Sequence, residues 1–173
     1  MQVEFTAEVT ESDLMNFKLY HNYHSVGGVA GFLFGVVALI ICGFSIANDL
    51  NISYILMMGF FGLFFTVYTP IGMKLKVKQQ IKANPAFNKP IKYTVTQDKI
   101  VLTLGEVTEE LTWDDIFKIT CTGKNLILYI TSVRANIIPL KCIGSDLDTF
   151  LKIAQTKLKP FQIKVNKNKI KLQ

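Results

Sequence analysis

The stretch that decides the fold is VGGVAGFLFGVVALIICGFSIA at Val26–Ala47, which contains no charged residue. As a helix that rises 1.5 Å per residue, it is about 33 Å long, and the hydrocarbon core of a bilayer is about 30 Å thick. Four residues later a second uncharged run follows, ISYILMMGFFGLFFTVYTP over residues 52–70. Because a link this short requires antiparallel helices, the sequence predicts a transmembrane hairpin with spans at about 26–47 and 52–70.

Two other interpretations, one of the first run alone and one of both runs, are less well supported. Ser45-Ile46-Ala47 resembles a signal-peptide cleavage site, but the run is too long for such a peptide and acidic rather than basic residues precede it. A soluble chain of 173 residues is too small to cover two helices that are apolar all round. Within the second run, Pro70 is expected to kink or end the span, because proline lacks a backbone donor and clashes with the preceding turn.

The distribution of lysine predicts the orientation. The link between the spans has no lysine or arginine, whereas four lysines follow the second span with no acidic residue before Asp98. Positive charge favours the cytoplasmic side of a membrane. Since a hairpin returns the chain to the side from which it started, both termini are expected in the cytoplasm.

Glycine recurs every four residues on the first span, at Gly27, Gly31 and Gly35, and the second span contains Gly59 and Gly62. Such spacing lets a second helix approach closely. Two uses remain open: packing between the two spans, or the face of a homodimer.

After the hairpin the sequence period changes from helix to strand. Six strands in one meander are predicted, at residues 91–96, 99–104, 106–112, 116–122, 126–131 and 136–141. A helix follows, with Ser145 as its N-cap, an end before Pro160, and an apolar stripe at Leu147, Phe150, Leu151, Ala154 and Leu158.

The first residues also have the pattern of a strand, since Val3, Phe5, Ala7 and Val9 alternate with polar residues. This strand is expected to join the same sheet, and Thr10 or Ser12 is expected to cap a helix that leads into the membrane. The predicted fold is an α+β membrane protein: a transmembrane hairpin plus a small antiparallel pleckstrin-homology-like β-barrel closed by a C-terminal helix.

The predicted organisation has five parts. They are an N-terminal strand and helix (1–25), the hairpin (26–73), a basic helical linker that stops at Asn84-Pro85 (74–90), the pleckstrin-homology-like domain (91–160) and a lysine-rich tail (161–173).

This order of parts resembles the YcxB-like family of bacterial membrane proteins. The resemblance lies in the early strand before Thr10-Glu11-Ser12-Asp13, the two spans, the Asn84-Pro85 stop, Leu111-Thr112-Trp113-Asp114-Asp115-Ile116 with Ile119, and Ile138-Pro139. It implies two spans and a pleckstrin-homology-like domain that faces the cytoplasm of a bacterium. It implies no catalytic residue, because the family has no generally assigned activity.

The residues themselves predict neither an enzyme nor a cofactor. His21 and His24 lie just before the first span, where such side chains are expected at the level of the lipid headgroups. No carboxylate or cysteine is placed in the sequence to complete a metal site with them. The residues after the second span contain no histidine that would activate Cys121 or Cys142, and no glycine-rich phosphate loop occurs. Cys42, Cys121 and Cys142 are odd in number and lack metal-ligand spacing, so free thiols are expected.

The formal charge of +6 comes almost entirely from lysine, with Arg134 as the only arginine. Nucleic acid is therefore not an expected partner, because its readers use arginine and exposed aromatic residues. We expect attraction to anionic headgroups instead, through Lys74, Lys76, Lys78, Lys82, Lys164, Lys167, Lys169 and Lys171. Trp113, Phe161, Ile163 and Val165 are candidate partner contacts. The alternative for Trp113 is packing in the core or at a strand edge. The alternatives for the other three are insertion into the membrane interface or addition to a sheet edge.

The expected function is that of a non-enzymatic binding or regulatory module in the bacterial cytoplasmic membrane. Its expected partners are the lipid bilayer and a protein or a second copy, and no small-molecule substrate is indicated. One alternative is an immunity protein against a membrane-active peptide or toxin, an idea that rests on architecture alone. Another is an anionic-lipid-binding membrane protein.

Overall fold

The computed structural model describes residues 2–84, 87 and 89–166, and the chain is an α+β protein of two units. The helical unit comprises Lys18–Gln79, and the sheet unit comprises Met1–Phe17 with Gln80–Gln173. Helices α1 (Glu11–Tyr23) and α4 (Thr69–Ala83) each contribute residues to both units.

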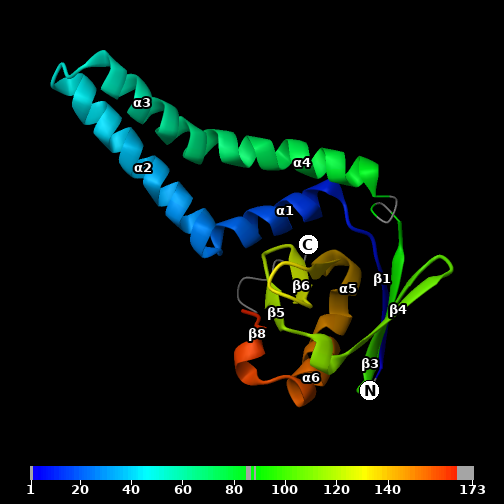
Figure 1. Ribbon diagram of the computed structural model, residues 1–173. Helices are drawn as coiled ribbons and strands as arrows, with labels where there is room; N and C mark the ends of the chain where they lie inside the picture. The colour runs from blue at the N-terminus through cyan, green and yellow to red at the C-terminus, as the bar shows by residue number, and fades with distance from the viewer. Residues whose placement is uncertain (1, 85–86, 88, 167–173) are drawn as a thin grey trace. The chain divides into compact units, whose positions relative to one another are not determined.

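The helical unit is a hairpin of α2 (Val26–Ala47) and α3 (Ile52–Leu63), which run antiparallel (Figure 1). Both helices start at a side-chain cap: the Ser25 hydroxyl accepts a hydrogen bond from the Gly28 amide, and the Asn51 side chain accepts one from the Ser53 amide. Two continuous helical segments, Val26–Ala47 and Ile52–Ala83, are long and apolar enough to cross a membrane.

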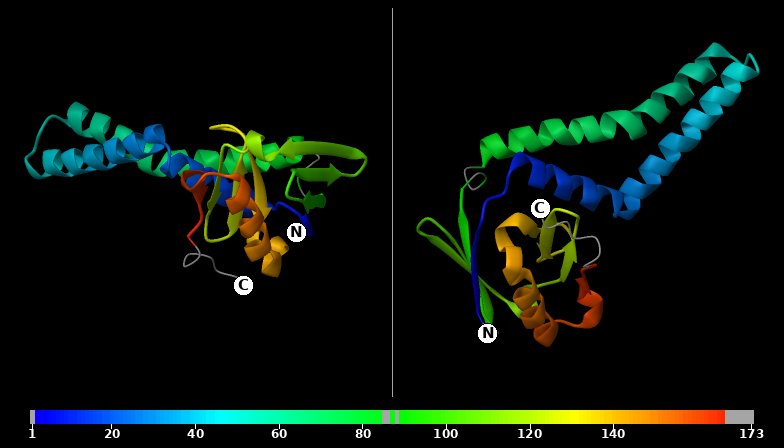
Figure 2. Two further views of the ribbon diagram at one scale, coloured as in Figure 1. Left: turned by 90° about the horizontal axis from the view of Figure 1, so that it is seen from below. Right: turned by 180° about the vertical axis from the view of Figure 1, so that it is seen from behind.

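The second helical segment continues through Pro70 into the predicted basic helix and ends at Ala83. A π-helical turn, η1 (Phe64–Tyr68), joins α3 to α4, and the Thr69 amide and hydroxyl both bond the Phe64 carbonyl. Pro70 thus follows directly after the π-helical hydrogen bonds, in the first turn of α4. At this position the missing backbone N–H of proline is tolerated. The axis bends between α3 and α4 (Figures 1 and 2), and α4 ends at Ala83, directly before the predicted stop at residue 84.

The first sheet of the sheet unit is antiparallel with strand order β1-β2-β3-β4. Val3 lies opposite Val95 and Ala7 opposite Ile91. The strand that precedes the hairpin thus joins the sheet that follows it, as predicted, and its partner is the first strand after the hairpin. The strands are β1 (Val3–Ala7), β2 (Ile91–Val95), β3 (Lys99–Leu104) and β4 (Val107–Thr112).

The second sheet has the order β7-β6-β5-β8, so the predicted single meander is wrong. A 3₁₀ turn, η2 (Trp113–Asp115), separates β4 from β5, and Asp115 Oδ2 accepts bonds from the Thr112 amide (2.8 Å) and hydroxyl (2.7 Å). Among the described residues the two sheets do not close into a barrel. The strands are β5 (Lys118–Cys121), β6 (Asn125–Tyr129), β7 (Ala135–Pro139) and β8 (Ile163–Lys164), of which β8 is parallel to β5.

The chain between β7 and β8 forms α5 (Leu140–Ile143), η3 (Gly144–Asp146), α6 (Leu147–Lys157) and η4 (Pro160–Gln162). The predicted apolar stripe of α6 is confirmed, since all five of its residues are buried in the core. The predicted cap at Ser145 is wrong. Gly144 has a φ of 50°, and the tight turn that starts there includes Ser145, which leaves Asp146 at the N-cap position.

Candidate functional site

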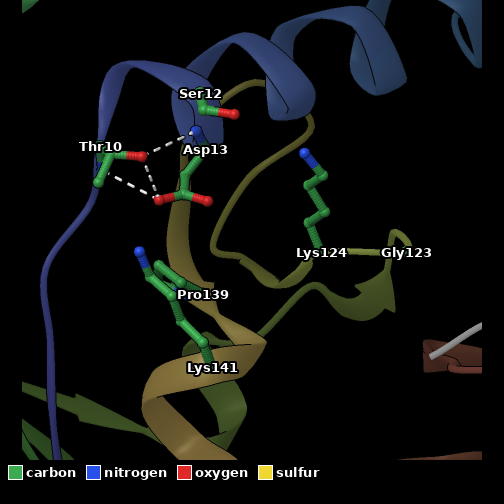
Figure 3. A pocket seen from close by; sticks show the side chains of 7 residues that line it. All are labelled: Thr10, Ser12, Asp13, Gly123, Lys124, Pro139 and Lys141. Carbon is green, nitrogen blue, oxygen red and sulfur yellow. Dashed lines mark hydrogen bonds between the residues drawn. The ribbon is translucent and has the colours of Figure 1, made fainter. Parts of the chain in front are cut away.

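The sheet unit contains a cavity of about 230 Å³ where the start of α1, the β5–β6 turn and the end of β7 meet (Figure 3). Its lining combines hydroxyl, carboxylate and ammonium groups with one proline. The residues are Thr10, Ser12, Asp13, Gly123, Lys124, Pro139 and Lys141.

Thr10 and Asp13 form the wall of the cavity that belongs to α1. The Thr10 hydroxyl and amide both donate to Asp13 Oδ2, at 2.6 and 3.0 Å, and the Asp13 amide donates back to the Thr10 hydroxyl at 3.4 Å. Thr10 is therefore the cap of α1, whereas Ser12, the other predicted candidate, lies exposed in the first turn. One oxygen of the buried Asp13 carboxylate is thus fully used in holding the helix start.

A buried polar network fixes α1 to the β5–β6 turn. Asn125 is fully buried, and its Nδ2 donates to the Asp13 carbonyl at 3.0 Å and to Asn16 Oδ1 at 3.3 Å. The Thr122 hydroxyl donates to the same Asn16 oxygen at 2.6 Å. Within the described chain, Asn125 Oδ1 has no hydrogen-bond partner. Sequence reasoning missed this network because its members lie more than a hundred positions apart and no local pattern connects them.

The residues that line the cavity offer hydroxyl, carboxylate and ammonium groups for hydrogen bonding and charge pairing. Lys124 and Lys141 lie on different elements around it, and the lining includes neither histidine nor cysteine. Such a site suits the binding of a polar or anionic group.

The cysteines and histidines occupy other parts of the chain. Burial raises the pKa of the Cys121 thiol to about 11, so this thiol is neutral at pH 7, and it donates to the Thr122 carbonyl. His24 stacks on Tyr20, with ring centroids 4.0 Å apart, and its Nδ1 lies 2.9 Å from the Tyr20 carbonyl oxygen. No group of three or more His, Cys, Asp or Glu residues that would hold a metal occurs in the described part of the chain.

The predicted membrane-surface lysines fall into two sets. Lys74, Lys76, Lys78 and Lys82 are exposed along α4, and Lys164 is exposed in β8. Lys167, Lys169 and Lys171 lie outside the described residues.

Four of the five predicted packing glycines lie where α2 meets the second helical segment. A Cβ on Gly35 would be 2.8 Å from Phe65 Cβ, and one on Gly62 would be 2.5 Å from Leu39 Cδ2. Gly31 faces the Phe65 ring and Gly59 faces the Cys42 sulfur, whereas a Cβ on Gly27 would meet nothing within 4 Å.

The candidate contact residues have different surroundings. Trp113 is 4% exposed, lies beside Phe150 and donates its indole N–H to the Thr96 carbonyl at 3.1 Å, so its position is that of a core residue. Ile163 and Val165 are partly buried against the core, and β8 adds to the sheet edge. Phe161 is exposed, and so is Phe117, which sequence reasoning missed because it lies within a predicted strand.

Comparison with known protein families gives a match to a described family. The family model described as YcxB-like protein matches residues 95–154, from the last residue of β2 into α6. No curated protein and no solved structure matches the chain. The resemblance predicted from the sequence is thereby confirmed, and the segment over residues 95–154 is YcxB-like.

Proposed function

We propose that this protein is a non-enzymatic binding module anchored in the bacterial cytoplasmic membrane. In this proposal α2 and α3 cross the bilayer and both termini lie in the cytoplasm. The sheet unit is a pleckstrin-homology-like domain that presents to a partner the cavity lined by Thr10, Lys124 and Lys141. The family match, the two apolar helices and the pairing of β1 with β2 support it.

The pairing of β1 with β2 is the observation that carries the topology. β1 precedes the hairpin and β2 follows it, yet Val3–Ala7 pairs with Ile91–Val95 in one sheet. If the hairpin crosses a membrane, both of its ends must return to the same side for this sheet to form. The exposed lysines of α4 favour the cytoplasm as that side.

The surface of the hairpin supports insertion into lipid. Large apolar side chains point outward along both helices, as Leu33 (56% exposed) and Phe60 (63% exposed) illustrate. In water such a continuous apolar surface is costly, at roughly 25 cal/mol per Å² of apolar area. In the hydrocarbon core of a bilayer this cost is absent, and the helical backbone satisfies its own hydrogen bonds.

The architecture of the sheet unit supports the pleckstrin-homology-like assignment. Two antiparallel four-stranded arrangements, apart from the parallel edge strand β8, enclose a shared core. The apolar face of the C-terminal helix α6 packs into that core, which is the role expected for a closing helix. Exposed Lys74, Lys76, Lys78 and Lys82 also favour a second candidate function, binding of anionic lipid.

Single-cysteine variants test both halves of the proposal in a background in which Cys42, Cys121 and Cys142 are replaced. We expect Asn48→Cys, in the link between α2 and α3, to react with an impermeant maleimide in intact cells. Asp98→Cys, in the exposed β2–β3 turn, should react only after permeabilisation. Labelling of both positions only after permeabilisation would overturn the topology.

The binding half is tested with a photo-crosslinking maleimide at Ser12→Cys, on the cavity rim. We expect a discrete adduct in native membranes that is lost when Lys124 and Lys141 are both changed to Gln. The same reagent at Asp98→Cys is the control, because this turn is not part of the cavity lining. Adducts that do not depend on the two lysines, or equal adducts at both positions, contradict a partner site at the cavity.

A further inference from the structure

Two phenylalanines of the sheet unit are largely exposed. Phe117 is 53% exposed and Phe161 is 70% exposed, whereas Phe5 and Phe150 of the same unit lie in the core. A single exposed apolar side chain is ordinary, but a cluster at one place marks a contact surface. The two rings therefore indicate a contact surface only if they lie close together on the unit.

The pairing of β5 with β8 brings the two positions together. The strands are parallel, with Ile119 opposite Ile163, so Phe117 and Phe161 each lie two residues before a paired position at the same strand end. Gln162 connects the two segments at this end, because its side-chain amide donates to the Ile116 carbonyl at 3.0 Å and to the Phe117 carbonyl at 3.2 Å. Figure 1 shows β8 beside β5, on the side of the unit where α6 ends.

One lysine contacts the Phe117 ring, and two exposed lysines are sequence neighbours of Phe161. Lys118 Nζ lies 5.9 Å from the Phe117 ring centroid and 4.5 Å from that of Tyr129, and exposed Lys159 and Lys164 flank Phe161 in the sequence. The chain has no acidic residue after Asp148. The nearest acids before Phe117 are Asp114 and Asp115, and one oxygen of Asp115 is occupied by Thr112.

We propose that Phe117, Lys118, Lys159, Phe161 and Lys164, here named the Phe-Lys patch, dock the sheet unit onto an anionic membrane surface. The rings enter the headgroup region, and the ammonium groups contact lipid phosphates. Exposed aromatic side chains among lysines match an anionic lipid interface. A protein partner fits less well, because lysine is depleted at the centre of protein interfaces. The inference rests on the proposed membrane anchoring.

The test places an environment-sensitive fluorophore (NBD) at Phe161→Cys in the full chain, with the native cysteines replaced. The protein is reconstituted into vesicles of phosphatidylcholine alone or with phosphatidylglycerol added. With the anionic lipid we expect a blue-shifted emission and a several-fold increase in quenching by brominated lipid. Raising the salt concentration should reverse both changes, because salt screens exposed charges.

The matched control is Val107→Cys carrying the same fluorophore. Val107 is also 70% exposed, but Glu106 and Glu109 are its neighbours, so its fluorophore should remain in water with either lipid. A second variant combines Phe161→Cys with Lys159→Glu and Lys164→Glu, which should abolish the response to phosphatidylglycerol. The emission of Trp113 shows whether each variant has a folded core.

The outcomes separate this inference from the proposed function. If the chain floats with the vesicles but the fluorophore at position 161 stays in water, the Phe-Lys patch is overturned and the anchoring stands. Equal burial in both vesicle types, or burial only in native membranes that contain other proteins, also overturns docking to anionic lipid. If the chain does not float with vesicles, the anchoring and the inference that rests on it both fail.

Discussion

The helical unit and the sheet unit use the same apolar residues in opposite ways. In the hairpin, Leu33 and Phe60 point outward, and Gly35 and Gly62 lie at the contact between the helices. In the sheet unit, large side chains such as Phe150 fill the interior. Water drives large apolar groups inward, whereas in lipid helices associate by close approach of their backbones at small residues. This difference between the two units is the one that the proposed insertion of the hairpin into lipid requires.

The largest expected effect comes from truncating a buried ring. Phe150→Ala should lower the free energy of unfolding of the sheet unit by about 3–5 kcal/mol, because it leaves a cavity beside Trp113. Phe60→Ala, which truncates an exposed ring of the hairpin, should change this value by less than about 0.5 kcal/mol. Urea unfolding of the purified full chain in detergent, followed by Trp113 emission, measures both. Equal losses for the two variants would contradict the comparison.

A smaller effect is expected from adding one methyl group between the helices. Gly35→Ala would place its Cβ 2.8 Å from Phe65 Cβ and 2.9 Å from Thr66 Cγ2, so we expect a loss of about 1–3 kcal/mol in hairpin stability. Gly43→Ala is the control on the same helix, because its Cβ would meet nothing within 4 Å. Helix loss on heating in detergent, monitored by circular dichroism, should differ between the two variants while Trp113 emission does not. A hairpin that tolerates both equally would show that the helices do not pack closely at Gly35.

The smallest expected effect is a pH dependence confined to the sheet unit. The hydrogen bonds from the Thr112 hydroxyl and amide hold the pKa of Asp115 below its usual range. Because the folded pKa is depressed, the stabilisation is present above the ordinary carboxyl pKa of about 4 and is lost as the pH falls through the folded value. Thr112→Val should therefore destabilise the unit slightly at pH 7 and not at about pH 2, as measured by urea unfolding. Thr108→Val, exposed on the same strand, should show no such dependence, and equal pH profiles for both variants would refute this role of Thr112.

The parts that sequence reasoning predicted correctly depend on local patterns. The uncharged runs place α2 and α3, alternation in Val3–Ala7 and Lys99–Leu104 places β1 and β3, and the stripe from Leu147 to Leu158 places the buried face of α6. Each signal lies within one element and reflects burial on one side of it. The match to the YcxB-like family, over residues 95–154, includes β3 and most of the α6 stripe but none of β1, α2 or α3.

The parts of the fold that sequence reasoning did not predict depend on distant contacts or on local backbone geometry. The short strand β8 pairs with β5 across more than forty residues, and this pairing places Phe161 and Phe117 at the same strand end. The turn at Thr112–Asp115 divides the expected meander, although its acidic and hydroxyl residues also suit an ordinary loop. The Asp13–Asn125 network joins elements on either side of the hairpin, so no window of sequence contains both partners.

The pairing of Val3 with Val95 also sets an order of events during synthesis. At about 5–20 residues per second, Val3 leaves the ribosome on the order of 10 s before its partner. The later strands β5, β6 and β7 pair with their neighbours in sequence, whereas β1 pairs with a strand that is synthesised after the whole hairpin. The first sheet can therefore be completed only after the hairpin has been synthesised and its two ends have come together. Under the proposed topology, a chain whose N-terminus crosses the membrane leaves one edge of β2 unpaired, and an unpaired strand edge can pair with a strand of another chain.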